Sequence, residues 1–507
     1  MNFQEYSAKQ AQRQASQEHE TLRRPLDFTP FEASLAGLDA EDWQAQETLM
    51  LERTAAELSE LQAGGELSAE ALTRLHLRRI RDLDQGRFNS VLELNPQALN
   101  DARRLDAERQ AGQVRSPLHG LTVLIKDNIA VAGLHNTAGA AVLRSAVATA
   151  DAPLVAQLRA AGAVILGKAN LSEWSNFMTE DSVNGYSVLG GPTRNPYGPF
   201  DVGGSSSGPA TATALNLCTF AVGTETAGSL IYPGSQNALA VLKPSRGLIS
   251  RRRIIPITEA QDTAGPMART VADLALLLGA LVGHDPQDPV TQAAQGFRLP
   301  DTLDANALQG KRVGVILPED FAPELRQKVE QGLAAAGAVA VPLTFEEPEL
   351  DWLGVMLHGM QRDLPAYLRD AGAPVTTLAE IVAFNSEHAE QHSPYGQTLL
   401  EMALDPERQV TDEAYEAART QNFERATGAL DSALEGVDWL LSLSNELSGV
   451  YSAAGYPALT VPAGQYSNGE PFGVTFVGPL LSDAGLIQAA YAYEQATQAR
   501  PALPAHL

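Results

Sequence analysis

The chain has 507 residues, and its apolar share of 44% is large enough to build a substantial hydrophobic core. Charged residues make up 19%, so wholesale disorder is excluded. Asp and Glu outnumber Lys and Arg by 61 to 36, which gives a formal charge of −25. A surface of this charge repels polyanions, so we expect neither nucleic acid nor an acidic membrane as a partner.

The cysteine content and the composition of the N-terminal segment both indicate the cellular compartment of the protein. The single cysteine, Cys218, cannot form an intrachain disulfide, and its apolar surroundings indicate a buried residue rather than a catalytic thiol. The polar segment 1–14 lacks the apolar core of a signal peptide. The longest apolar helix, 271–282, contains Asp273 and is shorter than the roughly 20 residues that cross a bilayer. We therefore predict a cytoplasmic protein.

The first predicted elements are helices. Residues 1–65 are polar and rich in Gln and Glu, and we interpret them as a helical N-terminal lead-in. Ser68 is suited to cap a helix over 70–83, with Glu70 in the first turn favouring the helix dipole. The pattern changes near residue 115, and the continuous apolar run 121–125 is typical of a buried strand.

Strands then alternate with helices. Asp151 and Pro153 open a helix that Gly162 closes, and a strand at 163–167 follows. The same alternation is expected in segments farther along the chain: strand 312–317, helix 323–337, strand 338–345, and further strands at 218–224, 458–464 and 473–478. This order predicts an α/β fold with a mixed, largely parallel central sheet flanked by helices.

Residues 66–507 are expected to form one domain, in which about 345–445 is a helical cap over the core. We expect this cap to build the substrate pocket with the side chains of Met356, Met360, Phe384 and Tyr395. The short basic run 251–253 is interpreted as a solvated turn.

Two lysines could act as a base. Lys126 and Lys168 each end an apolar strand, a position that is usually solvent-exposed. If such an amine is buried, desolvation disfavours its charged form and lowers its pKa, which makes the neutral amine a competent general base. The residues alone do not distinguish between the two lysines.

Two loops rich in small residues complete the candidate chemistry. The loop 202–208, VGGSSSG, could be a linker, a turn or a phosphate-binding loop, but it lacks the Gly-Lys-Ser/Thr ending of a P-loop. The loop 223–229, GTETAGS, could form an oxyanion hole with its backbone N–H groups, or Ser229 could simply cap a helix. Together the loops supply serines to a lysine base, a known alternative to Ser-His-Asp.

The chain resembles the amidase signature family in six segments that occur in family order. They cover about residues 70 to 495 and include HGLTVLIKDNIAVAGLHNTAG (119–139), AVILGKANLSEW (163–174), RNPYGPFDVGGSSSG (194–208), AVGTETAGSLIYPGSQNALAVLKPSRGLIS (221–250), QDTAGPMARTVADLA (261–275) and AGYPALTVPAG with PFGVTFVGP (454–479). The pattern is similar to the branch that contains peptide amidases and cyclic-amide hydrolases.

The resemblance implies a role for each matching residue. The base falls on Lys126, the relay serine on Ser205 after a cis peptide bond, and the nucleophile on Ser229. Backbone N–H groups of residues 226–229, namely Thr226, Ala227, Gly228 and Ser229, would form the oxyanion hole, with Ser206 and Thr224 as supporting hydrogen-bonding groups. The implied reaction is hydrolysis of a carboxamide through an acyl-enzyme, with no cofactor and no metal.

This sequence departs from the common family pattern around the nucleophile. Glu225 stands where many members have an aspartate, Ala227 precedes Gly228 in place of a second glycine, and Ile231 replaces an arginine. Ser207 and Pro209 also replace residues that are commonly small or glycine. None of these changes removes a member of the implied triad.

The histidines at 388 and 392 have helical i, i+4 spacing but lack the adjacent glutamate of zinc proteases, so a solvated helix is expected there.

The expected partner is a small amide or peptide amide, and either a monomer or a homodimer is compatible with the sequence. Two alternatives stay open: an A subunit of a tRNA-dependent amidotransferase, and a degenerate binding protein that kept the fold.

Overall fold

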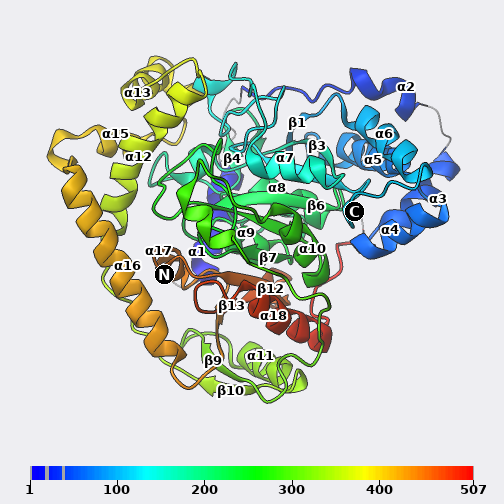
Figure 1. The fold of residues 1–507 in the computed structure, drawn as a ribbon. Helices are drawn as coiled ribbons and strands as arrows, with labels where there is room; N and C mark the ends of the chain where they lie inside the picture. The colour runs from blue at the N-terminus through cyan, green and yellow to red at the C-terminus, as the bar shows by residue number, and fades with distance from the viewer. Residues whose placement is uncertain (1–2, 17–21, 37–39, 506) are drawn as a thin grey trace.

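The computed structural model describes residues 3–16, 22–36, 40–505 and 507. At its centre is one eleven-stranded sheet with the order β1-β3-β2-β6-β8-β7-β12-β13-β11-β9-β10, and β4 and β5 form a separate two-stranded sheet (Figure 1). The strands are β1 (Val91–Leu94), β2 (Thr122–Lys126), β3 (Val164–Ala169), β4 (Tyr186–Ser187), β5 (Gly191–Pro192), β6 (Phe220–Glu225), β7 (Ala240–Lys243), β8 (Thr263–Ala268), β9 (Arg312–Ile316), β10 (Val339–Pro342), β11 (Trp439–Leu443), β12 (Ala458–Gln465) and β13 (Pro471–Val477).

Parallel pairing in the large sheet is gathered in two blocks. β2 pairs in parallel with β3 and β6, and β9 pairs in parallel with β10 and β11. The strands between these blocks and the edge strand β1 pair antiparallel. The predicted mixed α/β sheet flanked by helices is confirmed, and its parallel strands lie in those two blocks.

Helices cover the sheet and extend from one side of it (Figure 1). They are α1 (Phe3–Ser16), α2 (Glu32–Leu35), α3 (Ala40–Met50), α4 (Ala55–Gly64), α5 (Ala69–Arg79), α6 (Ala98–Gln110), α7 (Pro153–Ala160), α8 (Ser207–Ala214), α9 (Ile231–Gln236), α10 (Val271–Leu281), α11 (Pro323–Ala335), α12 (Trp352–Asp370), α13 (Leu378–Glu387), α14 (Ala389–His392), α15 (Thr398–Leu404), α16 (Asp412–Leu434), α17 (Ser448–Ala454) and α18 (Asp483–Thr497). Short helical turns are η1 (Thr29–Phe31), η2 (Ile80–Asp84, a π-helix), η3 (Ala141–Leu143), η4 (Glu173–Asn176), η5 (Pro289–Ala294) and η6 (Pro406–Arg408). None of the helices in the described ranges combines the length and apolar character needed to span a bilayer.

The predicted start of α5 is confirmed, because the Ser68 side chain accepts a hydrogen bond from the backbone N–H of Ala71.

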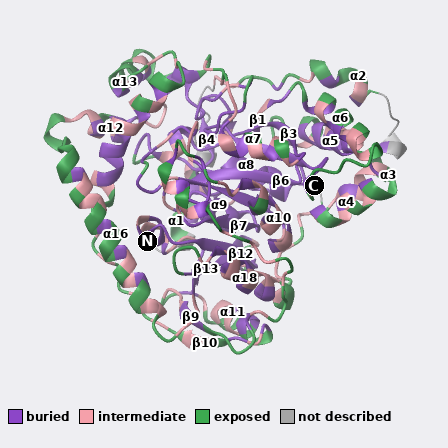
Figure 2. Ribbon diagram, in the orientation of Figure 1, coloured by how far each residue is buried: buried purple, intermediate pink, exposed green. Residues whose placement is uncertain are grey.

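The core is built from continuous apolar strands: every residue of β2, β3 and β6 is buried (Figure 2). Cys218 is buried directly before β6, as expected.

Helix α8 lies within this core, and all of its residues are buried. Its small side chains permit close packing: a Cβ on Gly208 would lie 2.3 Å from the carbonyl oxygen of Asn170. The helix therefore fixes the loop immediately before it, which carries Ser205 and Ser206.

The segment expected to form a cap contains helices α12 to α16, which lie along one side of the molecule, with α16 largely exposed (Figures 1 and 2). Before its expected end at 445, the chain returns to the large sheet as β11. The division into an N-terminal lead-in, a main domain and a cap stays a prediction.

Candidate active site

The strand ends of the first parallel block bring the candidate residues together. Lys126 is the last residue of β2, and Thr224 lies near the end of β6, which pairs in parallel with β2. The carboxyl ends of parallel neighbours meet at one edge of a sheet, where α/β proteins place ligand sites. Ser205 reaches this edge from the loop before α8, and Ser229 from the loop after β6.

The Lys126 amine is fully buried and has three oxygen neighbours. Its Nζ lies 2.8 Å from Ser205 Oγ, 2.9 Å from Thr224 Oγ1 and 3.3 Å from the Thr224 carbonyl oxygen. A neutral amine has two N–H donors and one lone pair. If Thr224 accepts both N–H groups, the lone pair faces the Ser205 hydroxyl, which is the orientation that a base needs.

The electrostatics favour this neutral form. Burial lowers the pKa of Lys126 from 10.5 to about 7, because desolvation penalises the ammonium ion. The carboxylates of Asp262 and Glu225 attract the charged form and partly oppose that decrease. The amine is therefore poised to exchange a proton near neutral pH.

Thr224 is itself held in place by its neighbours. Ser206 Oγ donates to the Thr224 carbonyl oxygen at 3.0 Å and accepts from the Thr224 backbone N–H at 3.2 Å. The side-chain amide of Asn128 donates to Thr224 Oγ1 at 3.0 Å. These contacts leave the two Thr224 acceptors little freedom to turn away from the amine.

The two implied serines differ in access. Ser205 follows a cis peptide bond and is fully buried, whereas Ser229 is 8% exposed and lines a cavity. The backbone N–H of Ser206 donates to the Ser229 carbonyl oxygen at 3.1 Å, which ties the two loops together. Among the described residues, no hydrogen bond joins the two hydroxyls directly, and such contacts often tighten only when substrate binds.

The loop that carries Ser229 presents free donors. The backbone N–H groups of Ala227, Gly228 and Ser229 have no hydrogen-bond acceptor within the described part of the chain. Gly228 has a φ of 86°, which glycine adopts without strain. The Glu225 carboxylate accepts from the N–H groups of Leu230 at 2.7 Å and Ile231 at 3.0 Å, so it anchors the chain just after Ser229.

Ser229 opens into a cavity of about 370 Å³. Its walls combine aromatic, amide and carboxyl side chains with the backbone of the Ser229 loop: Tyr6, Ser175, Asn176, Phe177, Asn184, Gly204, Thr226, Ala227, Gly228, Ser229, Tyr232, Ile257, Trp352, Met356, Asn445 and Glu446. Two wall residues, Ser175 and Asn176, and Trp174 just before them have φ between 49° and 68°, a strained conformation that tends to occur at functional sites.

The expectation for the pocket was only partly right. Met356 lines the cavity, but Met360, Phe384 and Tyr395 do not: Met360 is buried in a core cluster, Phe384 packs against that cluster, and Tyr395 packs against another. The reason is geometric: one face of α12 turns toward Ser229, and α13 and the segment after it pack behind that helix. Sequence reasoning also missed Tyr6, which contributes from α1.

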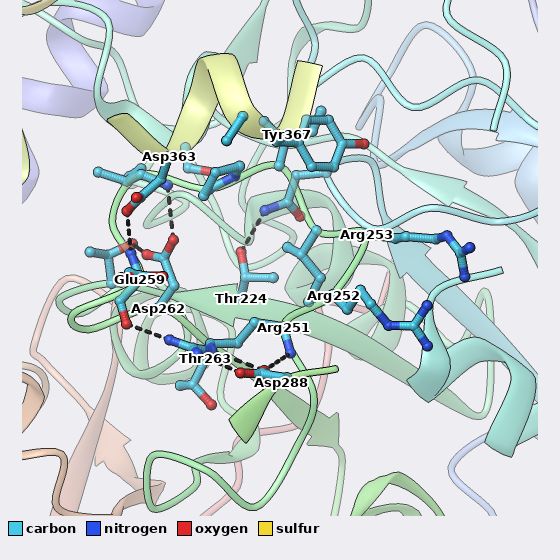
Figure 3. Close-up of a pocket in the computed structure, with 18 of the residues that line it drawn as sticks. Thr224, Arg251, Arg252, Arg253, Glu259, Asp262, Thr263, Asp288, Asp363 and Tyr367 are labelled. Carbon is cyan, nitrogen blue, oxygen red and sulfur yellow. Dashed lines mark hydrogen bonds and ion pairs between the residues drawn. The ribbon is translucent and has the colours of Figure 1, made fainter. Parts of the chain in front are cut away.

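A second cavity, of about 260 Å³, is lined by Thr224 and Asn128. It shares Ser175, Thr226 and Ile257 with the first, and it is also lined by the basic run 251–253 (Figure 3). The run forms a turn, as expected, but it is only partly solvated, because Arg251 and Arg252 pair with Asp288 at 2.5 Å and Asp285 at 2.9 Å.

Asp262 also lines this second cavity, close to the loop of Ser229. It accepts a hydrogen bond from Thr226 Oγ1 at 2.5 Å. Burial raises the pKa of this carboxyl to about 7.

Lys168, the second candidate base, has different partners from those of Lys126. Its Nζ forms an ion pair with Asp127 Oδ1 at 3.2 Å and donates to the His135 carbonyl oxygen and to Asn136 Oδ1, both at 2.9 Å. Desolvation lowers the pKa of Lys168, and the charge of Asp127 partly opposes this decrease. No serine is among these partners, so the structure assigns Lys168 to packing.

Comparisons with known proteins agree with this geometry. The family model for amidases matches residues 71–444. A protein named as a probable amidase of Arabidopsis thaliana is 37% identical over 456 residues, covering 86% of this chain and 88% of that protein. The A subunit of glutamyl-tRNA(Gln) amidotransferase of Thermosynechococcus vestitus is 30% identical, covering 85% of this chain and 95% of that protein.

Two crystal structures show the same fold. An amidase family protein from Bacillus anthracis has a TM-score of 0.91 at 37% identity and covers 94% of this chain and 97% of its own. The native peptide amidase from Stenotrophomonas maltophilia has a TM-score of 0.81 at 40% identity, and the match covers 90% of this chain and 99% of that protein. The chain belongs to the amidase family and is a hydrolase that acts on carbon–nitrogen bonds.

Proposed function

We propose that the chain cleaves a carboxamide C–N bond with Ser229 as nucleophile, Ser205 as proton relay and Lys126 as base. The observation that carries this proposal is the buried Lys126 amine, 2.8 Å from Ser205 Oγ, with its pKa lowered to about 7. Neutral Lys126 accepts the proton of Ser205 as Ser205 accepts that of Ser229, and Ser229 Oγ bonds to the amide carbon.

The tetrahedral intermediate places a negative charge on the former carbonyl oxygen. The unpaired N–H groups of Ala227, Gly228 and Ser229, with that of Thr226, are suited to stabilise this oxyanion. In comparable enzymes one such donor contributes about 3 to 4 kcal/mol. Ser206 and Thr224 hold the base in its orientation and do not touch the substrate.

The proton then returns to the leaving nitrogen. Protonated Lys126 gives a proton back through Ser205, the C–N bond breaks, and ammonia or an amine leaves an ester on Ser229. A water molecule, deprotonated by the same relay, adds to the ester carbon, and collapse of that intermediate releases the carboxylate and restores the Ser229 hydroxyl. We propose a linear or peptide-like carboxamide as the substrate.

We further propose a stand-alone cytoplasmic enzyme rather than an amidotransferase subunit. The identity to the peptide amidase, 40%, exceeds the 30% identity to the amidotransferase subunit. The acidic charge of −25 disfavours contact with tRNA. If the proposal is right, the purified chain hydrolyses amides without ATP, tRNA or another subunit; a requirement for any of these would contradict it.

A substrate panel tests the chemistry. Amino-acid amides, peptide amides, aliphatic amides and cyclic lactam dimers are offered to the wild type, to Ser229→Ala and to Ser467→Ala, which alters an exposed turn. We expect Ser229→Ala to reduce kcat at least about a thousandfold, because a catalytic serine is lost, and Ser467→Ala to leave it unchanged. Activity that survives intact in Ser229→Ala would refute the nucleophile.

A further inference from the structure

The wall beside the oxyanion loop contains a glutamate for which the proposed mechanism has no use. Glu446 lies in the turn between β11 and α17 and lines the same cavity as Ser229. The turn touches the catalytic loop: a Cβ on Gly228 would lie 2.8 Å from Nδ2 of Asn445, the residue before Glu446. Glu446 therefore borders the space into which Ser229 opens.

Glu446 also lacks a partner of its own. Within the described ranges of the chain, its side chain makes no hydrogen bond and no ion pair. Burial and then the neighbouring carboxylates of Asp320 and Glu347 raise its pKa to about 7. A partly desolvated carboxylate without a partner is costly, and a cation that binds beside it removes that cost.

The rest of the cavity fits a cation as well. Its described lining contains no lysine or arginine that could pair with Glu446. Four aromatic rings line it, those of Tyr6, Phe177, Tyr232 and Trp352, and aromatic faces attract organic cations. An anionic substrate would meet no countercharge here.

A second polar side chain in the cavity wall, that of Asn176, also has an oxygen without a donor among the described residues. Asn176 is held by its side-chain N–H, which donates to Asn184 Oδ1 at 2.7 Å. Its own Oδ1 is buried and, among the described residues, has no donor. Asn176 Oδ1 lies inside the wall rather than on its surface, so among the described lining residues the acceptor left to an N–H-bearing ligand is the Glu446 carboxyl group.

We propose that Glu446 is a specificity residue that binds a protonated amine on the carboxamide substrate. The preferred substrates are then amino-acid or peptide amides with a free ammonium group. This inference rests on the proposed function and narrows its substrate class. Glu446 takes no part in the bond-breaking step.

Two matched substrate pairs test this assignment. Leucinamide is compared with its α-hydroxy analogue, and N-acetyl-lysinamide with N-acetyl-norleucinamide, so that each pair differs in a single ammonium group. We expect the wild type to prefer the cationic member of at least one pair by about tenfold or more in kcat/KM. Glu446→Gln should reduce that preference by about tenfold, chiefly through KM, and leave the neutral amides within twofold.

The controls separate recognition from folding and from the proposed chemistry. Glu390→Gln, in exposed α14, should retain the wild-type preference. Binding of the four amides to Ser229→Ala, with and without Glu446→Gln, measures the same preference without turnover. Equal losses for both members of each pair, or no wild-type preference in turnover or binding, would overturn the role of Glu446. Hydrolysis of the neutral amides that depends on Ser229 would still support the proposed function.

Discussion

At the scale of single residues, the burial of Lys126 lowers the stability of the folded protein. A lysine held with a pKa of about 7 is neutral in the folded protein at a pH where the unfolded chain would protonate it. Between pH 7 and 10.5 the unfolded state therefore binds more protons, so the free energy of unfolding rises with pH in this window. The shift corresponds to a destabilisation of about 4 kcal/mol at pH 7.

This cost predicts that an inactive variant is the more stable protein. Lys126→Met removes the buried amine but also its hydrogen bonds, so we expect it to gain about 2 kcal/mol at pH 7. At pH 9 the gain should nearly vanish, because the wild-type penalty falls by about 2 kcal/mol. Denaturant unfolding of both proteins at the two pH values measures this; a difference that stays constant with pH would contradict the buried neutral amine.

Thr224 is expected to act by orienting the amine. Thr224→Val removes the hydroxyl that accepts from Lys126 and Asn128, and we expect kcat to fall about tenfold or more with KM little changed. Thr224→Ser keeps the hydroxyl and should restore most of the rate. If serine rescues no better than valine, the hydroxyl does not orient the base.

The two candidate lysines illustrate what a local pattern leaves open. Lys126 and Lys168 share an apolar strand before them and complete burial. They differ in what lies around the amine: hydroxyl and carbonyl oxygens for Lys126, a carboxylate for Lys168. Those partners come from distant segments, so no reading of the strand alone could assign the base, and the family resemblance was needed.

At the scale of elements, helix α1 contributes to the cavity that Ser229 lines. Tyr6 lines it, with its ring centroid 6.1 Å from that of Tyr232. Ser7 donates a hydrogen bond to Glu470, and Arg13 pairs with Asp181 at 2.9 Å. These contacts hold a helix from the expected lead-in against the main sheet and the cavity wall.

Removing this helix is expected to impair substrate binding and spare the fold. Deletion of residues 1–16 should raise KM about tenfold with kcat changed less, because Tyr6 is lost from the wall while Gln236 still hydrogen-bonds Glu470 at 3.0 Å. Tyr6→Ala should reproduce most of the effect, and Tyr6→Phe little of it. If the deletion variant has an unchanged KM and an unchanged circular dichroism spectrum, α1 does not contribute to substrate binding.

The elements that apolar runs predicted are largely the ones observed, including β2, β3, β12 and β13. Strand β8 was missed because its sequence, TAGPMA, has the composition of a loop. In the structure its glycine allows close approach: a Cβ on Gly265 would lie 2.2 Å from the carbonyl oxygen of Leu242 in β7. Packing between strands, rather than strand propensity, places this segment in the sheet.

At the scale of the whole molecule, the site is assembled from segments spread along almost the entire chain. Lys126, Ser205 and Ser229 could be named from the sequence because they fall on motifs through which the chain resembles the amidase signature family. The cavity walls from Tyr6 and Glu446 could not, because ordinary helix and turn residues reach the site only through the fold. The residues of the proposed chemistry can therefore be found in sequence motifs, whereas the walls of the cavity depend on the fold.

The central claim is that neutral Lys126 activates Ser229, and the rate at which a fluorophosphonate labels Ser229 measures it without a substrate. We predict a rate that is constant above about pH 7 and falls about tenfold per pH unit below it, because protonation of the amine removes the base. Asp262→Asn should keep the slope but move it to lower pH, because this carboxylate raises the pKa of Lys126, and Lys126→Met should label slowly at every pH. A labelling rate that is flat between pH 5 and 8, or unchanged in Lys126→Met, would contradict the account.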